Sequence, residues 1–186
     1  MAHPTIVRVF DAGEETVRDS RGMETQVPFI VMEYVDGRNL KDIIAEGPLD
    51  SSEAVRIVSG ILTALEYAHR ALLVHRDIKP GNVMVTSNGQ VKVMDFGIAR
   101  AVSDNSATVT DTSAILGTAQ YFSPEQARGE TVDARTDLYS TGVVLFELLT
   151  GRAPFQGERA AAVAYQHISE APPKPSSINP KVSPAL

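Results

Sequence analysis

Two short apolar runs near the start of the chain predict β-strands. The segments TIVRVFDAG (residues 5–13) and PFIVMEYV (residues 28–35) are rich in β-branched and aromatic residues. The polar and charged stretch 14–26 separates them. The pattern predicts two strands joined by a long exposed loop.

Helical spacing replaces the strand pattern after residue 37. Asn39 can cap a short helix that runs to about residue 44. A longer helix is predicted from 51 to about 69, because Asp50 and Glu53 have the spacing of a capping box. The apolar residues of this helix recur at helical intervals: Val58, Ile61, Leu62 and Leu65.

A β-hairpin is predicted within NVMVTSNGQVKVMDFG, residues 82–97. Apolar and polar residues alternate on both sides of Asn88 and Gly89, a pair that favours a tight hairpin turn. Residues 98–120 have no steady period and contain many Ser and Thr. For that segment we expect a mobile loop, where functional residues are often found.

The last third of the chain is predicted to be helical. A helix starting at Asp133 would end before Gly151, with four residues on one face: Leu138, Thr141, Leu145 and Leu148. The Pro-rich tail 171–186 can be either a linker or a loop within the domain.

Composition narrows the class of protein. The chain has 186 residues, of which 43% are hydrophobic, so it is long enough for one globular domain. The net charge of −6 and the scattered basic residues argue against a nucleic-acid partner. Because the chain has no Cys, disulfides and thiolate metal sites are excluded. The most apolar stretch, 141–151, is too short to span a membrane, and the first residues do not resemble a signal peptide, so we expect an intracellular protein.

Three polar residues close together indicate phosphoryl-transfer chemistry. No glycines have the spacing of a G-x-G loop and no Walker motif is present, but His75-Arg76-Asp77 is followed by Asn82. Asp95-Phe96-Gly97 stands at the far end of the predicted hairpin. In this interpretation Asp77 accepts the proton of the substrate hydroxyl, and Asn82 and Asp95 supply oxygen ligands for Mg²⁺.

Lys79 completes this set, since it can meet the charge that develops on the transferred group. Each residue also has an ordinary structural interpretation: His75 in the core, Asp77 in a turn, and residues 95–97 at a strand end. Their joint occurrence in the right order favours the catalytic interpretation.

With these motifs, the chain resembles the eukaryotic-like bacterial serine/threonine protein kinases of actinobacteria. The resemblance extends to GTAQYFSPEQARG at 117–129, where Ser123 replaces the usual Ala, and to the helix that starts at Asp133. It implies a truncated α+β kinase-like fold: residues 1–32 a remnant of the N-lobe sheet, 33–38 the hinge, and 39–186 a mainly helical, incomplete C-lobe. Lys79 together with Thr118 implies Ser and Thr acceptors on protein substrates.

The resemblance also implies an ATP site. Backbone groups of Glu33 and Val35 would face the adenine, Met32 would be the gatekeeper, and Met84 would pack against the base, although a buried strand explains such residues equally well. Lys79, Asn82 and Asp95 would face the phosphates, with Mg²⁺ on Asn82 and Asp95 and Mn²⁺ as an alternative metal.

Regulation by phosphorylation is a further implication. Thr110 and Thr112 occupy the place where this bacterial group carries activating phosphothreonines, and Arg76 would pair with the phosphate. A Ser- and Thr-rich loop that is merely soluble is the alternative. Asp137 resembles the aspartate that braces the catalytic loop, although an acidic residue at a helix start is also favoured by the helix dipole.

Several groups of the kinase pattern are missing from residues 1–186. There is no glycine-rich loop, no strand lysine and no helix glutamate paired with it; Lys41 is the only lysine before Asp77 and follows the hinge. The last C-lobe helices, with the arginine that would pair with Glu125, are also missing. We therefore expect this segment alone to be inactive.

Two further classes remain open from the sequence. A pseudokinase that binds partners would not need Asp77, Asn82 and Asp95, and a metal-dependent hydrolase lacks its histidine cluster. As a kinase, the protein is expected to be cytoplasmic, with a membrane anchor elsewhere in a longer protein as an alternative. A homodimer that phosphorylates in trans is another expectation from the resemblance.

Overall fold

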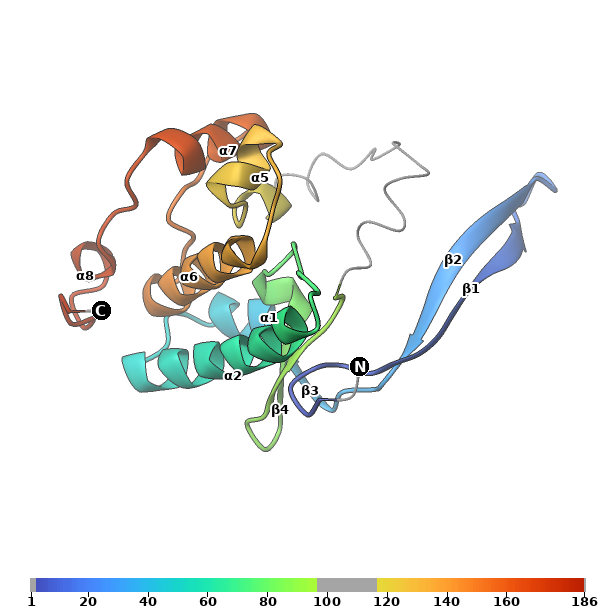
Figure 1. The fold of residues 1–186 in the computed structure, drawn as a ribbon, viewed down its shortest axis with the longest axis horizontal. Helices are drawn as coiled ribbons and strands as arrows, with labels where there is room; N and C mark the ends of the chain where they lie inside the picture. Colours follow the sequence, from blue (N-terminus) through green and yellow to red (C-terminus); the bar gives the residue numbers. More distant parts are fainter. Residues whose placement is uncertain (1–2, 97–116, 186) are drawn as a thin grey trace.

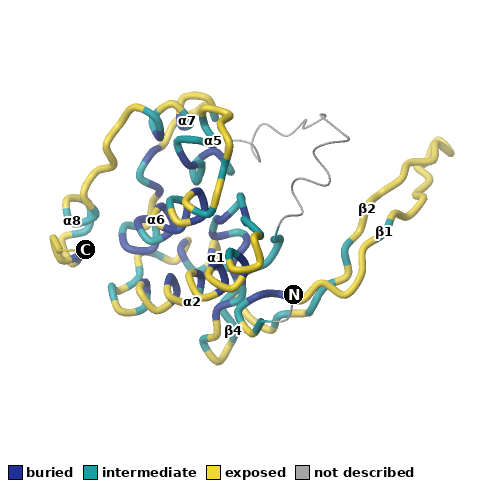
Figure 2. Tube along the Cα trace, viewed as in Figure 1, coloured by how far each residue is buried: buried dark blue, intermediate teal, exposed yellow. Residues whose placement is uncertain are grey.

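The N-terminal apolar runs form one long hairpin. In the computed structural model, which describes residues 3–96 and 117–185, β1 (Val9–Arg18) pairs antiparallel with β2 (Glu24–Met32). The hairpin projects away from the helical body, and its residues are mostly exposed (Figures 1 and 2).

The expected long loop at 14–26 is therefore wrong. Only the residues between Arg18 and Glu24 form the turn, in which Asp19 Oδ1 accepts the backbone N–H groups of Arg21 at 2.8 Å and Met23 at 2.9 Å. Gly22 has a φ of 80°. An aspartate that binds its own backbone stabilises a tight turn, so the charged flanks are free to pair as strands.

A second, three-stranded sheet lies beside the helices. It has the order β3 (Gly37–Asn39), β4 (Val83–Thr86), β5 (Val91–Val93), with antiparallel neighbours. The predicted hairpin at 82–97 is confirmed, and Gly89 supplies the positive φ of 82° that its turn requires. The N-terminal segment runs along β5: Val7 N donates to Val93 O at 2.9 Å, and Val93 N donates to Thr5 O at 2.8 Å.

The first two helices start where their caps predict. Asn39 accepts the Lys41 N–H at the start of α1 (Leu40–Ala45), and Asp50 accepts the Ser52 and Glu53 N–H groups at the start of α2 (Ser51–Arg70). The reciprocal half of the predicted capping box is absent from the described hydrogen bonds of these residues, because the Glu53 carboxylate pairs with Arg56 at 2.6 Å.

The core lies between α2 and α6 (Ala134–Thr150), with one face of the small sheet completing it (Figure 2). Asp133 caps α6, and Gly151 ends it with a φ of 76°. Two predicted core positions are wrong: Leu62 is 40% exposed and Leu138 is 49% exposed. The same helices do bury the expected Ile61, Leu65 and Leu148, together with Ile57 and Val144.

Four further short helices have defined bounds, besides the helical residues 117–119. These are η1 (Pro80–Asn82), α5 (Pro124–Arg128), α7 (Ala160–Ser169) and α8 (Pro175–Ile178). The Pro-rich tail packs onto the helical body, since Val182 is buried and Asn179 Nδ2 donates to Leu149 O at 2.7 Å. The tail is therefore packed against the rest of the domain, and it includes the short helix α8.

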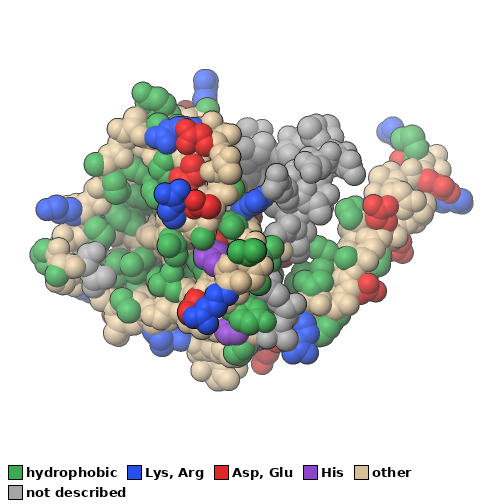
Figure 3. Space-filling view, in the orientation of Figure 1, with side chains coloured by type: hydrophobic (Ala, Val, Ile, Leu, Met, Phe, Trp, Pro, Cys, Tyr) green, Lys and Arg blue, Asp and Glu red, His purple; other side chains and the backbone are tan. Residues whose placement is uncertain are grey.

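The surface carries charges of both signs. On the face shown in Figure 3, basic and acidic side chains are interspersed over the helical body, and acidic residues are prominent on the projecting hairpin. None of the helices within the described ranges is long and apolar enough to cross a bilayer. The loop expected at 98–120 lies outside the described residues up to position 116.

Candidate active site

Asp137 fixes the backbone of the loop that carries Asp77. Asp137 is completely buried at the start of α6, and its two carboxylate oxygens accept the backbone N–H groups of His75 and Arg76, each at 2.8 Å. His69 Nε2 donates to the same carboxylate at 2.7 Å. Three donors thus compensate the buried charge, and the loop backbone is fixed to α6. The sequence indicated this role for Asp137 and missed His69.

His75 stabilises the loop as a neutral imidazole. It is 1% exposed, its Nε2 donates to Met94 O at 2.8 Å, and its Nδ1 accepts the Asp77 N–H at 3.2 Å. Phe96 packs edge-on against its ring at a centroid distance of 4.6 Å. Burial lowers the pKa of His75, because the charged form loses hydration. The core interpretation and the catalytic-loop interpretation of His75 are therefore compatible.

Asp77, Lys79 and Asn82 form one polar cluster. Asn82 Nδ2 donates to Asp77 O at 2.8 Å and to Asp77 Oδ2 at 3.0 Å, and Lys79 Nζ lies 2.8 Å from the same Oδ2. Lys79 also donates to Thr118 Oγ1 at 3.2 Å. The carboxylate is held from two directions and remains partly accessible, with its side chain 24% exposed.

Asp95 follows the hairpin directly, and the residue before it, Met94, forms a hydrogen bond with Asn82. Met94 N donates to Asn82 O at 3.0 Å, and Asp95 follows with a φ of 64°. A left-handed conformation is unusual for Asp, so the chain turns sharply at this residue. In the described hydrogen bonds, the Oδ1 of Asn82 has no partner. Amide and carboxylate oxygens are hard ligands, and this donor set, at the end of η1 and just after β5, fits Mg²⁺.

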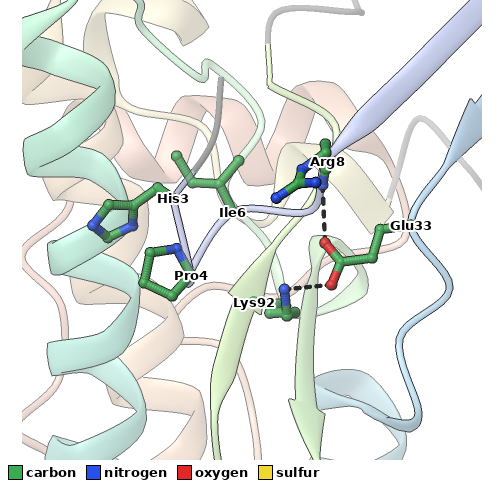
Figure 4. Close-up of a pocket in the computed structure, with 6 residues that line it drawn as sticks. All are labelled: His3, Pro4, Ile6, Arg8, Glu33 and Lys92. Carbon is green, nitrogen blue, oxygen red and sulfur yellow. Dashed lines mark hydrogen bonds and ion pairs between the residues drawn. The ribbon is translucent and has the colours of Figure 1, made fainter.

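The residues proposed to face adenine lie in two places. Met84 belongs to the three-stranded sheet, and Glu33 and Val35 lie on the segment after β2. Met84 on β4 is half-buried, and its Sδ lies 4.0 Å from Asn39 Nδ2. Val35 is half-buried and has no regular secondary structure. The side chain of Glu33 turns toward Lys92 and the Arg8 backbone (Figure 4). No described contact tests whether these residues bind a nucleotide.

Asn39 supplies a link that sequence reasoning missed. Besides capping α1, it donates through Nδ2 to Gly81 O at 2.8 Å. The loop that carries Asp77 is thereby joined to β3 across 42 residues of sequence. The local signal in the sequence, a helix N-cap, gives no hint of this second bond.

The segment 117–129 also contacts the loop that carries Asp77. Ser123 and Gln126 form a complete capping box on α5, and Gln126 Nε2 donates to Arg76 O at 2.7 Å. Glu125 accepts the Thr136 hydroxyl at 2.6 Å. Burial acts to raise the pKa of Glu125, but hydrogen bonds, first that of Thr136, outweigh it and the pKa is lowered.

A hollow of about 520 Å³ adjoins Lys79 and Thr118. Its walls include Lys41, Tyr121 and Glu147. Tyr121 Oη donates to Glu147 Oε2 at 2.7 Å, and burial raises the pKa of the Glu147 carboxyl. The hollow therefore lies directly beside the loop that carries Asp77 and Lys79.

Thr110 and Thr112 lie outside the described residues. Their proposed partner, Arg76, has a φ of 71°, and its Nε is buried without a hydrogen-bond partner among the residues that the structure describes. The backbone of Arg76 is fixed on both sides, by Asp137 and by Gln126.

Comparison with known proteins agrees with the motifs. The family model described as "Protein kinase domain" matches residues 1–183. The chain is 55% identical over 181 residues to the "Probable serine/threonine-protein kinase PknB" of Bifidobacterium longum. It is 56% identical over 185 residues to the "Probable serine/threonine-protein kinase SCO3848" of Streptomyces coelicolor.

A third relative is the "Serine/threonine-protein kinase PknB" of Mycolicibacterium smegmatis, which is 51% identical over 185 residues. The three alignments cover 97% to 99% of this chain but only 26% to 29% of the relatives' own length. The likeness to actinobacterial kinases is thus confirmed, as is the α+β kinase-like fold of this segment.

Proposed function

Because this chain belongs to the protein kinase domain family, we propose that it carries the catalytic loop and the acceptor side of a serine/threonine kinase. The reaction would move the γ-phosphoryl group of ATP to a Ser or Thr hydroxyl of a protein. The observation that carries the proposal is the cluster of Asp77, Lys79 and Asn82 on a backbone fixed by Asp137.

Asp77 is proposed as the base. As the acceptor oxygen forms its bond to phosphorus, its O–H bond breaks and the proton passes to the Asp77 carboxylate, while ADP departs with the electrons of the broken P–O bond. Asn82 keeps that carboxylate oriented. Lys79 stabilises negative charge on the transferred group, and its contact with Thr118 favours an alcohol acceptor lying along the 117–121 segment.

Asn82 and Asp95 would hold Mg²⁺, which neutralises charge between the phosphates when it is bound. Glu33 and Val35 would contact adenine through their backbone, and Met84 through its side chain. Since ATP is the donor, the cytoplasm is the compartment where the reaction would take place.

We also propose that residues 1–186 alone have no kinase activity. This stretch contains no G-x-G sequence and no lysine before Lys41, so it lacks the glycine loop and strand lysine that hold ATP phosphates in kinases. Positioning dominates this chemistry, and the segment alone should therefore be inactive.

The experiment uses a chimera in which residues 1–186 replace the matching segment of the Mycolicibacterium smegmatis relative. The chimera is incubated with γ-labelled ATP, Mg²⁺ and a generic protein acceptor, and the labelled amino acids are identified. Label on phosphoserine or phosphothreonine supports the proposal. Binding of ATP without any transfer would instead favour a noncatalytic pseudokinase, the alternative from the sequence.

A further inference from the structure

A hollow of about 300 Å³ lies behind the segment that follows β2 (Figure 4). In it, Glu33 Oε1 lies 2.6 Å from Lys92 Nζ, and Glu33 Oε2 accepts the Arg8 backbone N–H at 3.2 Å. The Glu33 N–H in turn donates to Arg8 O at 2.8 Å. Glu33 is thus held through both its backbone and its carboxylate.

Lys92 is the least exposed basic side chain among the Lys and Arg ion pairs in the described part of the chain. The Lys92 side chain is 11% exposed and that of Glu33 is 31% exposed. The hydrogen bond from Lys92 lowers the pKa of Glu33. Removal of Glu33 would leave the ammonium group of Lys92 poorly hydrated, so the protected end of this pair favours a fixed geometry.

Lys92 also has a defined relation to Met84. The two residues are directly opposite in the β4–β5 ladder, so their side chains lie on the same face of the sheet. Val91 and Val93, on either side of Lys92, are buried in the core on the other face. β5 is further anchored by the N-terminal segment through Val7 and Thr5. Lys92 therefore projects from a rigid strand.

We propose that Lys92 is a positioning residue for the adenine base of ATP: through Glu33 it sets the height of the 33–35 backbone above Met84. This inference rests on the proposed function, in which that backbone and Met84 enclose the base. Lys92 touches no part of the nucleotide in this proposal. Its effect should therefore be confined to the base, whereas the phosphates would be held through the Mg²⁺ on Asn82 and Asp95.

The test compares Lys92→Met with Lys92→Arg in the chimera. Equilibrium titrations use adenosine without metal, and ADP and inorganic tripolyphosphate with Mg²⁺, as probes. Lys92→Met should raise the Kd of ADP and of adenosine by about tenfold, because about 1.4 kcal/mol of a charge-assisted hydrogen bond is lost from the support of the base. The affinity for tripolyphosphate should stay the same. Lys92→Arg should restore most of the loss.

Steady-state rates supply an independent measurement. Lys92→Met should raise KM for ATP and leave kcat nearly unchanged, since the transferred group and Asp77 are not displaced. Lys174→Met, an exposed lysine at the start of α8, is the matched control and should change neither quantity.

Glu33→Met breaks the pair from the other side and decides the question if Lys92→Met fails to fold. The double variant should be no weaker for ADP than the worse single variant, because both changes remove the same interaction. Unchanged ADP affinity in the folded variants would overturn the proposal. An equal loss for tripolyphosphate would overturn it too, by assigning Lys92 to the phosphates. If the unaltered chimera neither binds ADP nor transfers phosphate, the proposed function itself has failed.

Discussion

The side-chain amide of Asn82 donates to Asp77 twice, at 2.8 Å to its carbonyl oxygen and at 3.0 Å to its carboxylate. Asn82 thereby fixes the orientation of the proposed base. Its own Oδ1 takes part in none of the described hydrogen bonds. A base and a metal ligand that share a hydrogen bond cannot move independently. The proposed base and the proposed metal ligand thus lie within six residues of sequence, from Asp77 to Asn82.

Asp95 is predicted to be indispensable for metal-dependent turnover. In the chimera, Asp95→Ala should abolish Mg²⁺-dependent phosphorylation, because the metal would lose a carboxylate ligand between the phosphates. Rates should be measured across a titration of Mg²⁺ and then of Mn²⁺. Phosphorylation at the unaltered rate in saturating metal would remove Asp95 from the site.

Thr110 and Thr112 are predicted to be modified by the kinase itself. After incubation of the chimera with ATP, mass spectrometry should find phosphate on one or both, transferred between two copies in trans. The phosphate would add about −1.5 to −2 charge beside Arg76. Mixing an Asp77→Asn chimera with an active copy of different mass tests the trans reaction. Phosphate confined to residues outside 95–125 would contradict this assignment.

The stability of residues 1–186 should fall as pH decreases below about 6.5. Burial holds the pKa of His75 below its ordinary value of 6.5, and that of His167 likewise. The unfolded chain therefore binds protons that the folded chain does not, and the stabilisation is complete only above pH 6.5. A protonated His75 Nδ1 would also lose the Asp77 N–H.

Urea unfolding between pH 5.5 and 7.5 measures this effect. His75→Gln keeps a donor that can reach Met94 O but does not titrate, so its unfolding free energy should vary less with pH. His167 remains in the variant and should preserve part of the slope. A variant with the slope of the unaltered chain would show that His75 does not contribute.

The predicted elements that depend on neighbouring residues agree with the structure. The caps at Asn39, Asp50 and Asp133 and the hairpin turn at Gly89 each need only a short segment to form. The polar flanks of β1 and β2 were misassigned because charged residues are acceptable in an exposed strand pair. Leu62 and Leu138 have core spacing, but which face a helix buries depends on its partner.

In the candidate site, too, local features were predicted from the sequence and contacts between distant residues were not. The motif predicted that Asp77, Lys79 and Asn82 lie together, and the hairpin predicted that Asp95 returns toward Asn82. The bonds from His69 to Asp137, from Asn39 to Gly81 and from Glu33 to Lys92 join residues 42 to 68 positions apart. Such pairs leave no periodic or local signal in one sequence, so only the folded chain reveals them.

Residues 1–186 by themselves should transfer little or no phosphate. With γ-labelled ATP and a generic protein acceptor, the segment and its Asp77→Asn variant should give the same background. Incorporation at a rate typical of kinases, about 1 to 100 per second, that disappears in the variant would contradict this limit. Apolar side chains exposed on β2, such as Phe29 at 43%, should also promote association of the segment.

The most direct test of the central claim is the rate of phosphoryl transfer by the chimera with Asp77→Asn. The substitution keeps the size of the side chain and removes the base, and Asp42→Asn on the exposed face of α1 is the matched control. The account predicts a fall in kcat of about 10² to 10⁴ for Asp77→Asn, with ADP affinity retained, and an unchanged rate for the control. Near-normal turnover by Asp77→Asn would contradict the assignment of Asp77 as the catalytic base.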